Sequence, residues 1–185
     1  MDTANHLRRQ PIAPPALTGV GRRARGTIAI MALDAKVLIV SESVHAGTRQ
    51  DRSGAALADA LAGHGFRVVE RRTVPDGVAP VATAIRDLAA EFHGLLVTTG
   101  GTGFSPTDLT PEATRTVLER EAPGLAEAMR AASPLGRLSR GAAGAIGPCL
   151  IVNVPGSPKG AVESIEAIID VVPHALVLLG GGHPH

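Results

Sequence analysis

Small and acidic residues cluster between residues 95 and 114, in the segment LLVTTGGTGFSPTDLTPEAT. Gly100, Gly101 and Gly103 let the backbone approach a ligand closely and leave N–H groups exposed, and the Thr102 hydroxyl adds a further donor. Such a turn suits a phosphate group, although close packing between a strand and a helix explains the glycines equally well. The segment has neither the Gly-Lys-Ser/Thr of a Walker loop nor the glycine spacing of a dinucleotide fingerprint.

Three aspartates stand in loops that also follow apolar segments. Asp108 comes two residues before Thr110, which is suited to cap a helix, so Asp108 itself has no obvious structural role. Asp51 could cap the helix that follows it, and Asp76 could simply form a Pro-Asp-Gly turn. Taken together, carboxylates beside a phosphate-type turn fit a nucleotide site, where they would hold Mg²⁺.

The elements that position these loops alternate between strand and helix patterns. Strand-length apolar runs rich in Val and Ile lie at 36–41, 66–74, 94–99 and 149–154, and helical spacing occurs at 54–65 and 79–92. Strands that are apolar on both faces and separated by helices indicate a parallel sheet with helices on both faces. The predicted fold class is therefore α/β with a mostly parallel sheet. Ligands on such sheets bind beyond the carboxyl ends of the strands, where these loops would meet.

Composition limits what such a site can bind. The chain has 185 residues, 44% of them hydrophobic, with no Trp, no Tyr and three Phe, so one aliphatic core is expected. Few aromatic residues and a net charge of +1 argue against a nucleic acid partner and favour a small ligand. No run approaches the roughly 18 apolar residues that a membrane helix needs. Cys149 is the only cysteine and is predicted to be a buried core thiol, which agrees with a cytoplasmic location.

The chain divides into an extension, one domain and a short tail. Residues 1–34 are rich in Arg, Pro and Gly without a sustained period, so they are predicted to be disordered or weakly ordered. Met31 directly precedes the first strand pattern and is a candidate translation start, and an Arg-rich transit peptide is the alternative interpretation of this segment. Residues 35–181 form the predicted domain, and residues 182–185 form the tail.

Motifs along this domain resemble the molybdopterin adenylyltransferases of the MogA/MoaB type, which are related to domains of gephyrin and of plant Cnx-type proteins. The motifs are DRSG at 51–54, VPD at 74–76, TTGGTGFSPTDLTPEA at 98–113, LSR at 138–140 and NVPGSPKG at 153–160. The resemblance implies a three-layer α/β/α fold and a homo-oligomer, either a trimer or a hexamer. It also implies a molybdenum insertase as a partner.

The resemblance further implies a reaction, in which ATP and Mg²⁺ are used to transfer AMP to the terminal phosphate of molybdopterin and pyrophosphate is released. Asp76 then looks like the residue most directly tied to catalysis, with Asp51 and Asp108 as catalytic residues that position Mg²⁺ or substrate. The residues similar to the family's substrate-binding set are Ser41, Gly100, Gly101, Thr102, Gly103 and Ser139, and those similar to its nucleotide-binding set are Pro155, Gly156, Ser157 and Pro158.

The sequence departs from the family pattern in two places. Glu42 stands where relatives commonly have Asp, and the segment 130–140 is several residues shorter than in many relatives, which is expected to reshape the pterin pocket around Ser133. Arg140 and Lys159 each belong to a motif and are candidates either for phosphate contacts or for solvated surface charge. Two other functions stay open: a non-catalytic pterin- or nucleotide-binding paralogue that serves as a carrier, and a phosphate-binding hydrolase on the same fold.

Overall fold

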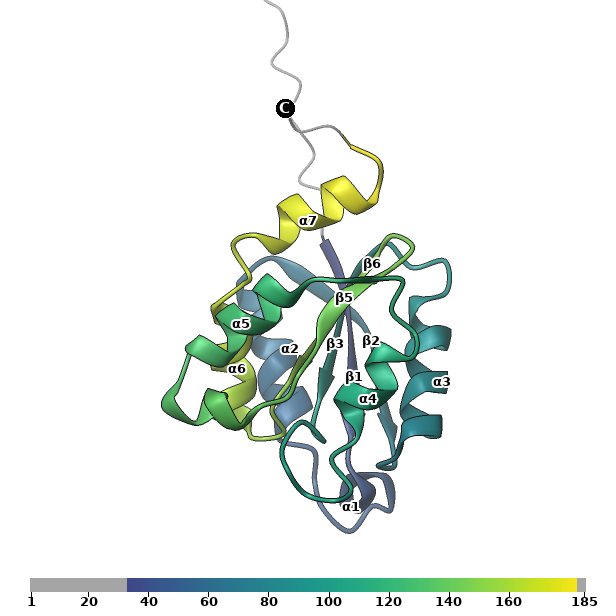
Figure 1. Cartoon of the computed structure of the whole chain (residues 1–185), viewed down its shortest axis with the longest axis vertical. Coiled ribbons are helices and arrows are strands. Elements are labelled where there is room, and N and C mark those ends of the chain that lie inside the picture. The colour runs from purple at the N-terminus through teal and green to yellow at the C-terminus, as the bar shows by residue number, and fades with distance from the viewer. Residues whose placement is uncertain (1–32, 183–185) are drawn as a thin grey trace, which may run out of the picture. The chain divides into compact units, whose positions relative to one another are not determined.

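The computed structural model describes residues 33–182, which form a six-stranded mixed sheet with helices on both faces (Figure 1). The strands are β1 (Leu33–Val40), β2 (Phe66–Val74), β3 (Gly94–Thr99), β4 (Arg120–Glu121), β5 (Ala143–Ile146) and β6 (Cys149–Val154). The helices are α1 (Glu42–His45), α2 (Ser53–Gly63), α3 (Val78–Ala89), α4 (Thr110–Arg115), α5 (Pro123–Ala131), α6 (Pro158–Glu166) and α7 (Val172–Leu179), with a 3₁₀ helix η1 at Pro134–Leu138.

The strand order is β2-β1-β3-β6-β5-β4. The first four strands in this order run parallel to one another, and β5 and β4 continue the sheet in antiparallel fashion. The prediction of a three-layer, mostly parallel α/β fold is confirmed. The antiparallel edge was not predicted, because β4 has only two residues and the sequence AGAI of β5 lacks the bulky residues typical of strands.

The sheet begins earlier than the predicted domain boundary at residue 35. Leu33 pairs with Phe66 of β2, and the Asp34 carboxylate accepts two hydrogen bonds from the Arg67 guanidinium, at 2.8 and 2.9 Å. This hydrogen bonding lowers the pKa of Asp34 below its usual value. Leu33 and Asp34 therefore belong to the sheet and not to the extension. The rest of the predicted extension, residues 1–32, and the end of the predicted tail, residues 183–185, lie outside the described part of the chain.

Two aliphatic cores lie on opposite faces of the sheet. Helices α2, α5, α6 and α7 pack on one face, and helices α3 and α4 pack on the other. Alternate residues of β1 point to the two cores: Val37 and Ile39 belong to the first, and Leu38 and Val40 to the second. This double burial explains why residues 37–40 of β1 are continuously apolar. Among the described helices, none combines the length and the hydropathy needed to cross a membrane.

Cys149 lies at the start of β6 and is fully buried, as predicted. Burial raises the pKa of its thiol to about 12. A thiol is nucleophilic in its thiolate form, and this one stays protonated at neutral pH. Cys149 is therefore a packing residue of the core.

A buried polar network joins β6 to its neighbours. The Asn153 side chain is 1% exposed, and its Nδ2 donates to the hydroxyls of Thr98 and Thr114, each at 2.9 Å. Its Oδ1 accepts from the Ala142 N–H at 3.0 Å. The Thr114 hydroxyl in turn donates its own proton to the Thr110 carbonyl at 2.8 Å. The amide of Asn153 thus has a partner for each of its hydrogens, and the network ties β3, β6 and α4 together.

We expect Asn153→Asp to lower the free energy of unfolding by about 2–4 kcal/mol. A carboxylate cannot donate to the two hydroxyls, and it would place an unpaired negative charge in the interior. Urea unfolding followed by circular dichroism measures the change. Gln50→Glu is the matched control, because Gln50 is exposed and the same chemical change there should shift stability by less than about 0.5 kcal/mol. Equal unfolding midpoints for the two variants would contradict the prediction.

Candidate functional site

A cavity of about 730 Å³ lies beyond the carboxyl ends of the parallel strands. Its walls come from the loops that follow β1, β2, β3 and β6, which are the loops that the sequence pattern brings together. The short helix α1, part of the first of these loops, lies at the end of the sheet opposite α7 (Figure 1). The predicted site residues that line this polar cavity are Ser41, Asp51, Asp76, Gly100, Gly101, Asp108, Gly156, Ser157 and Pro158.

The glycine turn after β3 has a backbone that other residues cannot adopt without strain. Gly100 has φ +105°, and a Cβ on it would lie 2.2 Å from the Val40 carbonyl oxygen. Gly101 has φ +63°, and a Cβ there would lie 2.4 Å from Thr110 Oγ1. The Thr110 hydroxyl is buried without a hydrogen-bond partner within the described residues. Steric demand therefore accounts for both glycines, and the turn still forms part of the cavity wall.

Thr102 and Gly103 are not brought into the cavity wall. Thr102 is 5% exposed, and its carbonyl accepts a hydrogen bond from the Arg140 N–H at 2.9 Å. A Cβ on Gly103 would lie 2.9 Å from Asp108 Oδ2, so this glycine leaves room for the carboxylate. These two residues support the loop that holds Asp108.

Asp76 and Asp108 each use one carboxylate oxygen to hold a loop. Asp76 Oδ2 accepts from the Glu42 N–H at 2.9 Å, which links the loop after β2 to the start of α1. Asp108 Oδ2 accepts from the Ser105 N–H at 2.8 Å. Within residues 33–182, the Oδ1 atom of each has no hydrogen-bond partner. Both carboxylates thus keep an oxygen that can bind a cation or a ligand.

Both carboxylate oxygens of Asp51 have protein partners, unlike those of the other two aspartates. Its Oδ1 accepts from the Gly54 N–H at 2.7 Å, in the first turn of α2, and its Oδ2 lies 2.6 Å from Arg71 Nη2. Its side chain is only 14% exposed. The helix-capping role that the sequence left open is therefore present, together with an ion pair that the sequence did not indicate.

These carboxylates fit a magnesium ion that arrives with phosphate groups. Mg²⁺ is usually held by one or two carboxylates and by substrate phosphates, and Asp76 and Asp108 each offer an oxygen. Asp51, which was predicted as a metal ligand, is already neutralised by Arg71. In the described part of the chain, no three His, Cys, Asp or Glu side chains are grouped so as to hold an ion by themselves.

Two arginines of the polar cavity were not singled out from the sequence. Arg49 and Arg52 line its wall, and neither forms an ion pair with a described residue. Arg49 Nη2 donates to Ser41 Oγ at 3.4 Å, which turns the guanidinium towards the end of β1. Both lie close to Asp51 in the sequence, and this proximity could have indicated that they belong to the same site.

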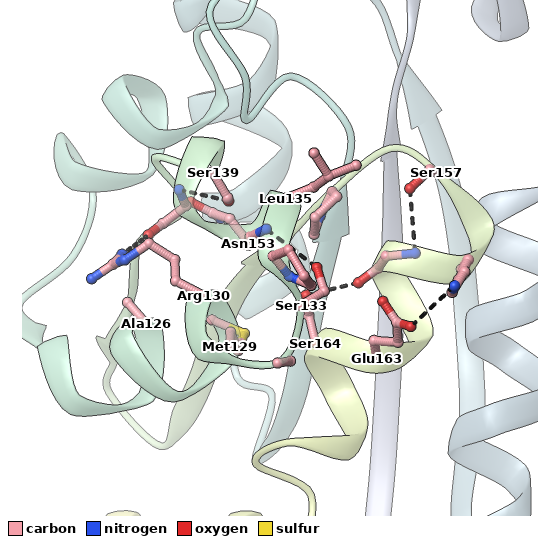
Figure 2. Close-up of a pocket in the computed structure, with 17 residues that line it drawn as sticks. Ala126, Met129, Arg130, Ser133, Leu135, Ser139, Asn153, Ser157, Glu163 and Ser164 are labelled. Atoms are coloured by element: carbon pink, nitrogen blue, oxygen red, sulfur yellow. Dashed lines mark hydrogen bonds and ion pairs between the residues drawn. The ribbon is translucent and has the colours of Figure 1, made fainter.

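A second cavity, of about 460 Å³, opens between α5, η1 and α6 (Figure 2). Met129 of α5 and Leu135 of η1 give it apolar walls, and Asn153, Ser139 and Glu163 give it polar groups. Ser133, whose role the short segment 130–140 left open, caps η1 by accepting from the Gly136 N–H at 3.2 Å and also lines this cavity. The remaining predicted residues found here are Ser139, Pro155 and Ser157.

The two cavities are neighbours. Ser157 lines both, and Pro155 lines the second. The loop of residues 155–158 packs on the glycine turn so closely that a Cβ on Gly156 would lie 3.2 Å from Gly100 Cα. The two cavities therefore adjoin at Ser157.

Comparison with known proteins shows which family has this sequence and fold. The sequence family described as the probable molybdopterin binding domain matches residues 36–174, which include the walls of both cavities. The chain belongs to this family. The molybdopterin adenylyltransferase of Helicobacter pylori strain J99 is 34% identical over 154 residues, which cover 80% of this chain and 88% of that protein. The molybdopterin biosynthesis enzyme MoaB from Thermus thermophilus has 47% identity and a TM-score of 0.75, over 80% of this chain and 97% of that one.

Some relatives in this molybdopterin-binding family are longer than this chain. The molybdenum cofactor biosynthesis bifunctional protein of Chlorobaculum tepidum is 33% identical over 152 residues. That match covers 80% of this chain but only 49% of the relative, so the chain spans about half of its length.

The two motif-associated basic residues do not lie where a phosphate would bind in the polar cavity. Lys159 lines the second cavity, and its side chain is 86% exposed. Its Nζ lies 3.7 Å from Glu163 Oε1. Arg140 lines neither cavity. Solvated surface charge is the simpler interpretation for Lys159. Arg140 forms hydrogen bonds with the loop that carries the glycine turn.

Proposed function

We propose that this protein is a molybdopterin adenylyltransferase of molybdenum cofactor biosynthesis, which transfers AMP from ATP to the terminal phosphate of molybdopterin. The observation that carries the proposal is the pair of adjoining cavities with different chemistry, one lined by carboxylates and arginines and the other partly apolar. A reaction between two bound substrates needs two such sites in contact. Family membership and the names of the relatives support the same activity.

The polar cavity would take the nucleotide. Arg49 and Arg52 supply positive charge to its phosphates, and the loop of Gly156 to Pro158 forms the adjoining wall. Asp76 and Asp108 would hold Mg²⁺, which neutralises charge on the phosphates when it is bound. The pairing of Arg71 with Asp51 neutralises one of the carboxylates that line this cavity.

The second cavity would take the pterin. A flat heterocycle with hydrogen-bonding edges fits apolar walls that carry a few polar groups, here Ser139 and Glu163. Its terminal phosphate would then extend past Ser157 towards Gly100 and Gly101, where the polar cavity begins.

The reaction in this arrangement is a phosphoryl-type transfer without a protein nucleophile. An oxygen of the pterin's terminal phosphate attacks the α-phosphorus of ATP, and the bond from that phosphorus to the β-phosphate bridging oxygen breaks as pyrophosphate leaves. The protein's task is to bring two anions together and align them, which in well-oriented systems can contribute about 7–11 kcal/mol to lowering the barrier. The carboxylates and arginines of the polar cavity surround the leaving pyrophosphate.

We also propose self-association, as a trimer or a hexamer, and a molybdenum insertase as the partner that uses the adenylated product. Large apolar side chains that are exposed in the single chain support self-association. They include Phe104 in the loop after β3, Leu135 and Leu138 in η1, and Val171, Val177 and Leu178 on or next to α7. Light scattering on the purified protein measures the oligomeric state, and a monomer at micromolar concentration would refute this part.

The purified protein incubated with molybdopterin, ATP and Mg²⁺ is expected to form adenylated pterin and pyrophosphate in equal amounts, detected by chromatography. An excess of chelator should lower the rate by about tenfold or more, because the phosphate charges lose their counter-ion. Binding of both ligands without product would favour a carrier. Release of inorganic phosphate from the pterin without an AMP adduct would favour a hydrolase.

A further inference from the structure

Arg140 follows Ser139, which lines the second cavity, and contacts the loop that joins β3 to α4 at several points. Its Nε donates to the Gly103 carbonyl at 2.7 Å, and its Nη2 donates to the Asp108 carbonyl. Its Nη1 pairs with Glu112, and its backbone N–H donates to the Thr102 carbonyl at 2.9 Å. One residue thus binds both ends of the loop that carries Asp108.

Within the loop itself, short-range hydrogen bonds join Ser105 and Asp108: the Ser105 N–H donates to Asp108 Oδ2 at 2.8 Å, and the Asp108 N–H donates to the Ser105 carbonyl at 2.9 Å. Residues 104–107 are exposed and belong to no helix or strand. The Arg140 guanidinium carbon also lies 5.7 Å from the centre of the Phe104 ring, which adds a cation–π contact with this loop. A planar guanidinium with donors pointing in several directions can make these contacts at once, whereas a lysine ammonium on a flexible stem cannot.

The same contacts argue against the phosphate-binding role that was one of the two sequence interpretations of Arg140. The side chain is 30% exposed, and each of its three nitrogens already donates to a protein oxygen. The second oxygen of Glu112 is buried without a partner among the described residues, so the arginine is the group that this carboxylate binds. Arg140 therefore acts on protein groups rather than on a ligand.

We propose that Arg140 is a positioning residue, which fixes the wall of one substrate cavity in position relative to the wall of the other. Its neighbour Ser139 lines the pterin cavity, and its guanidinium holds the backbone of Asp108, which lines the nucleotide cavity. The inference rests on the proposed function. Because Arg140 touches neither substrate, its loss should disturb the alignment of the reacting groups more than the binding of either one.

The test is Arg140→Lys, which keeps the charge and replaces the planar guanidinium, with its donors in a fixed arrangement, by one ammonium group on a flexible stem. The single-turnover rate of adenylation should fall by about tenfold or more, while the separately measured affinities for molybdopterin and for ATP change by less than about threefold. Amide hydrogen exchange at residues 103–109 should become faster in the free protein. Arg137→Lys is the matched control, since Arg137 is exposed in η1, lines neither cavity and should leave the rate and the exchange unchanged.

An unchanged rate, or affinities that fall as steeply as the rate, would overturn the positioning role. If Arg140→Lys does not fold, Glu112→Gln serves as the second variant, because it weakens the ion pair and leaves the guanidinium in place. It should give a smaller fall in rate and faster exchange at the same amides. A parent protein that forms no adenylated pterin refutes the proposed function. Unchanged exchange in the variants refutes the role of Arg140 whatever the parent's activity.

Discussion

Asp76→Asn is expected to lower the single-turnover rate of adenylation by about 10² or more, while the affinity for molybdopterin moves far less. The substitution preserves the shape of the side chain, and an amide oxygen can still accept the hydrogen bond from the Glu42 N–H. It removes the negative charge of a carboxylate whose Oδ1 has no hydrogen-bond partner within residues 33–182. The loss should therefore appear in the chemical step, where charge on the phosphates must be stabilised.

The control for this prediction is Asp59→Asn on the exposed side of α2, where the same charge is lost outside both cavities. Its rate should equal that of the parent. Single-turnover rates and pterin affinities measured for the parent and the two variants decide the matter. A rate for Asp76→Asn that matches the parent would exclude the mechanism proposed here, and a parallel loss of pterin affinity would make Asp76 a binding residue.

The other two aspartates give less direct tests of catalysis. In Asp108→Asn the amide oxygen can still accept from the Ser105 N–H, but Asp108 lies in the loop that Arg140 holds, so a change there combines the loss of charge with an effect on the loop. Asp51→Asn removes the ion pair with Arg71 and weakens a cap of α2, so it would lower stability as well as activity. Asp76 is the position where charge can be changed with the least change in structure.

Much of the fold follows from patterns in the sequence. β2, β3 and β6 have the predicted bounds. Burial on both faces of the sheet explains the apolar runs of β3 and β6, whereas β2 lies at the edge of the sheet and is mostly half-buried or exposed. The antiparallel edge is different, since β5 consists mostly of small residues and is defined by its pairing with β6. The two-residue connection at Gly147, which has φ +50°, was the available signal of a hairpin.

The site was predictable in part for a similar reason. Residues that follow parallel strands meet at one sheet edge by topology, so Asp51, Asp76, Asp108 and Gly100 could be placed together from their order alone. The second cavity depends on how α5, η1 and α6 pack, which no local period encodes. The contacts of Arg140 are likewise long-range, spanning 28 to 37 residues of sequence for its side-chain hydrogen bonds. Such pairings require tertiary structure.

Gly100→Ala is expected to lower the free energy of unfolding by about 3 kcal/mol or more and the adenylation rate by about 10² or more. Two costs combine at this position. A backbone with φ +105° is strained for alanine, and the new Cβ would lie 2.2 Å from the Val40 carbonyl oxygen, where atoms of β1 must move. Val40 directly precedes Ser41 and the loop that carries Asp51, so a shift there reaches the polar cavity from both sides.

Two other glycines separate these costs. Gly65 has φ +82°, and a Cβ on it would have no atom of the described residues within 4 Å, so Gly65→Ala should show the backbone strain alone, about 1–2 kcal/mol. Gly63 ends α2 with open space around it and without a positive φ, so Gly63→Ala should be neutral or stabilising by up to about 1 kcal/mol. Urea unfolding of the three variants gives the steric contribution as the difference between Gly100→Ala and Gly65→Ala. If that difference is negligible and Gly100→Ala retains full activity, the close contact between the glycine turn and β1 does not shape the site.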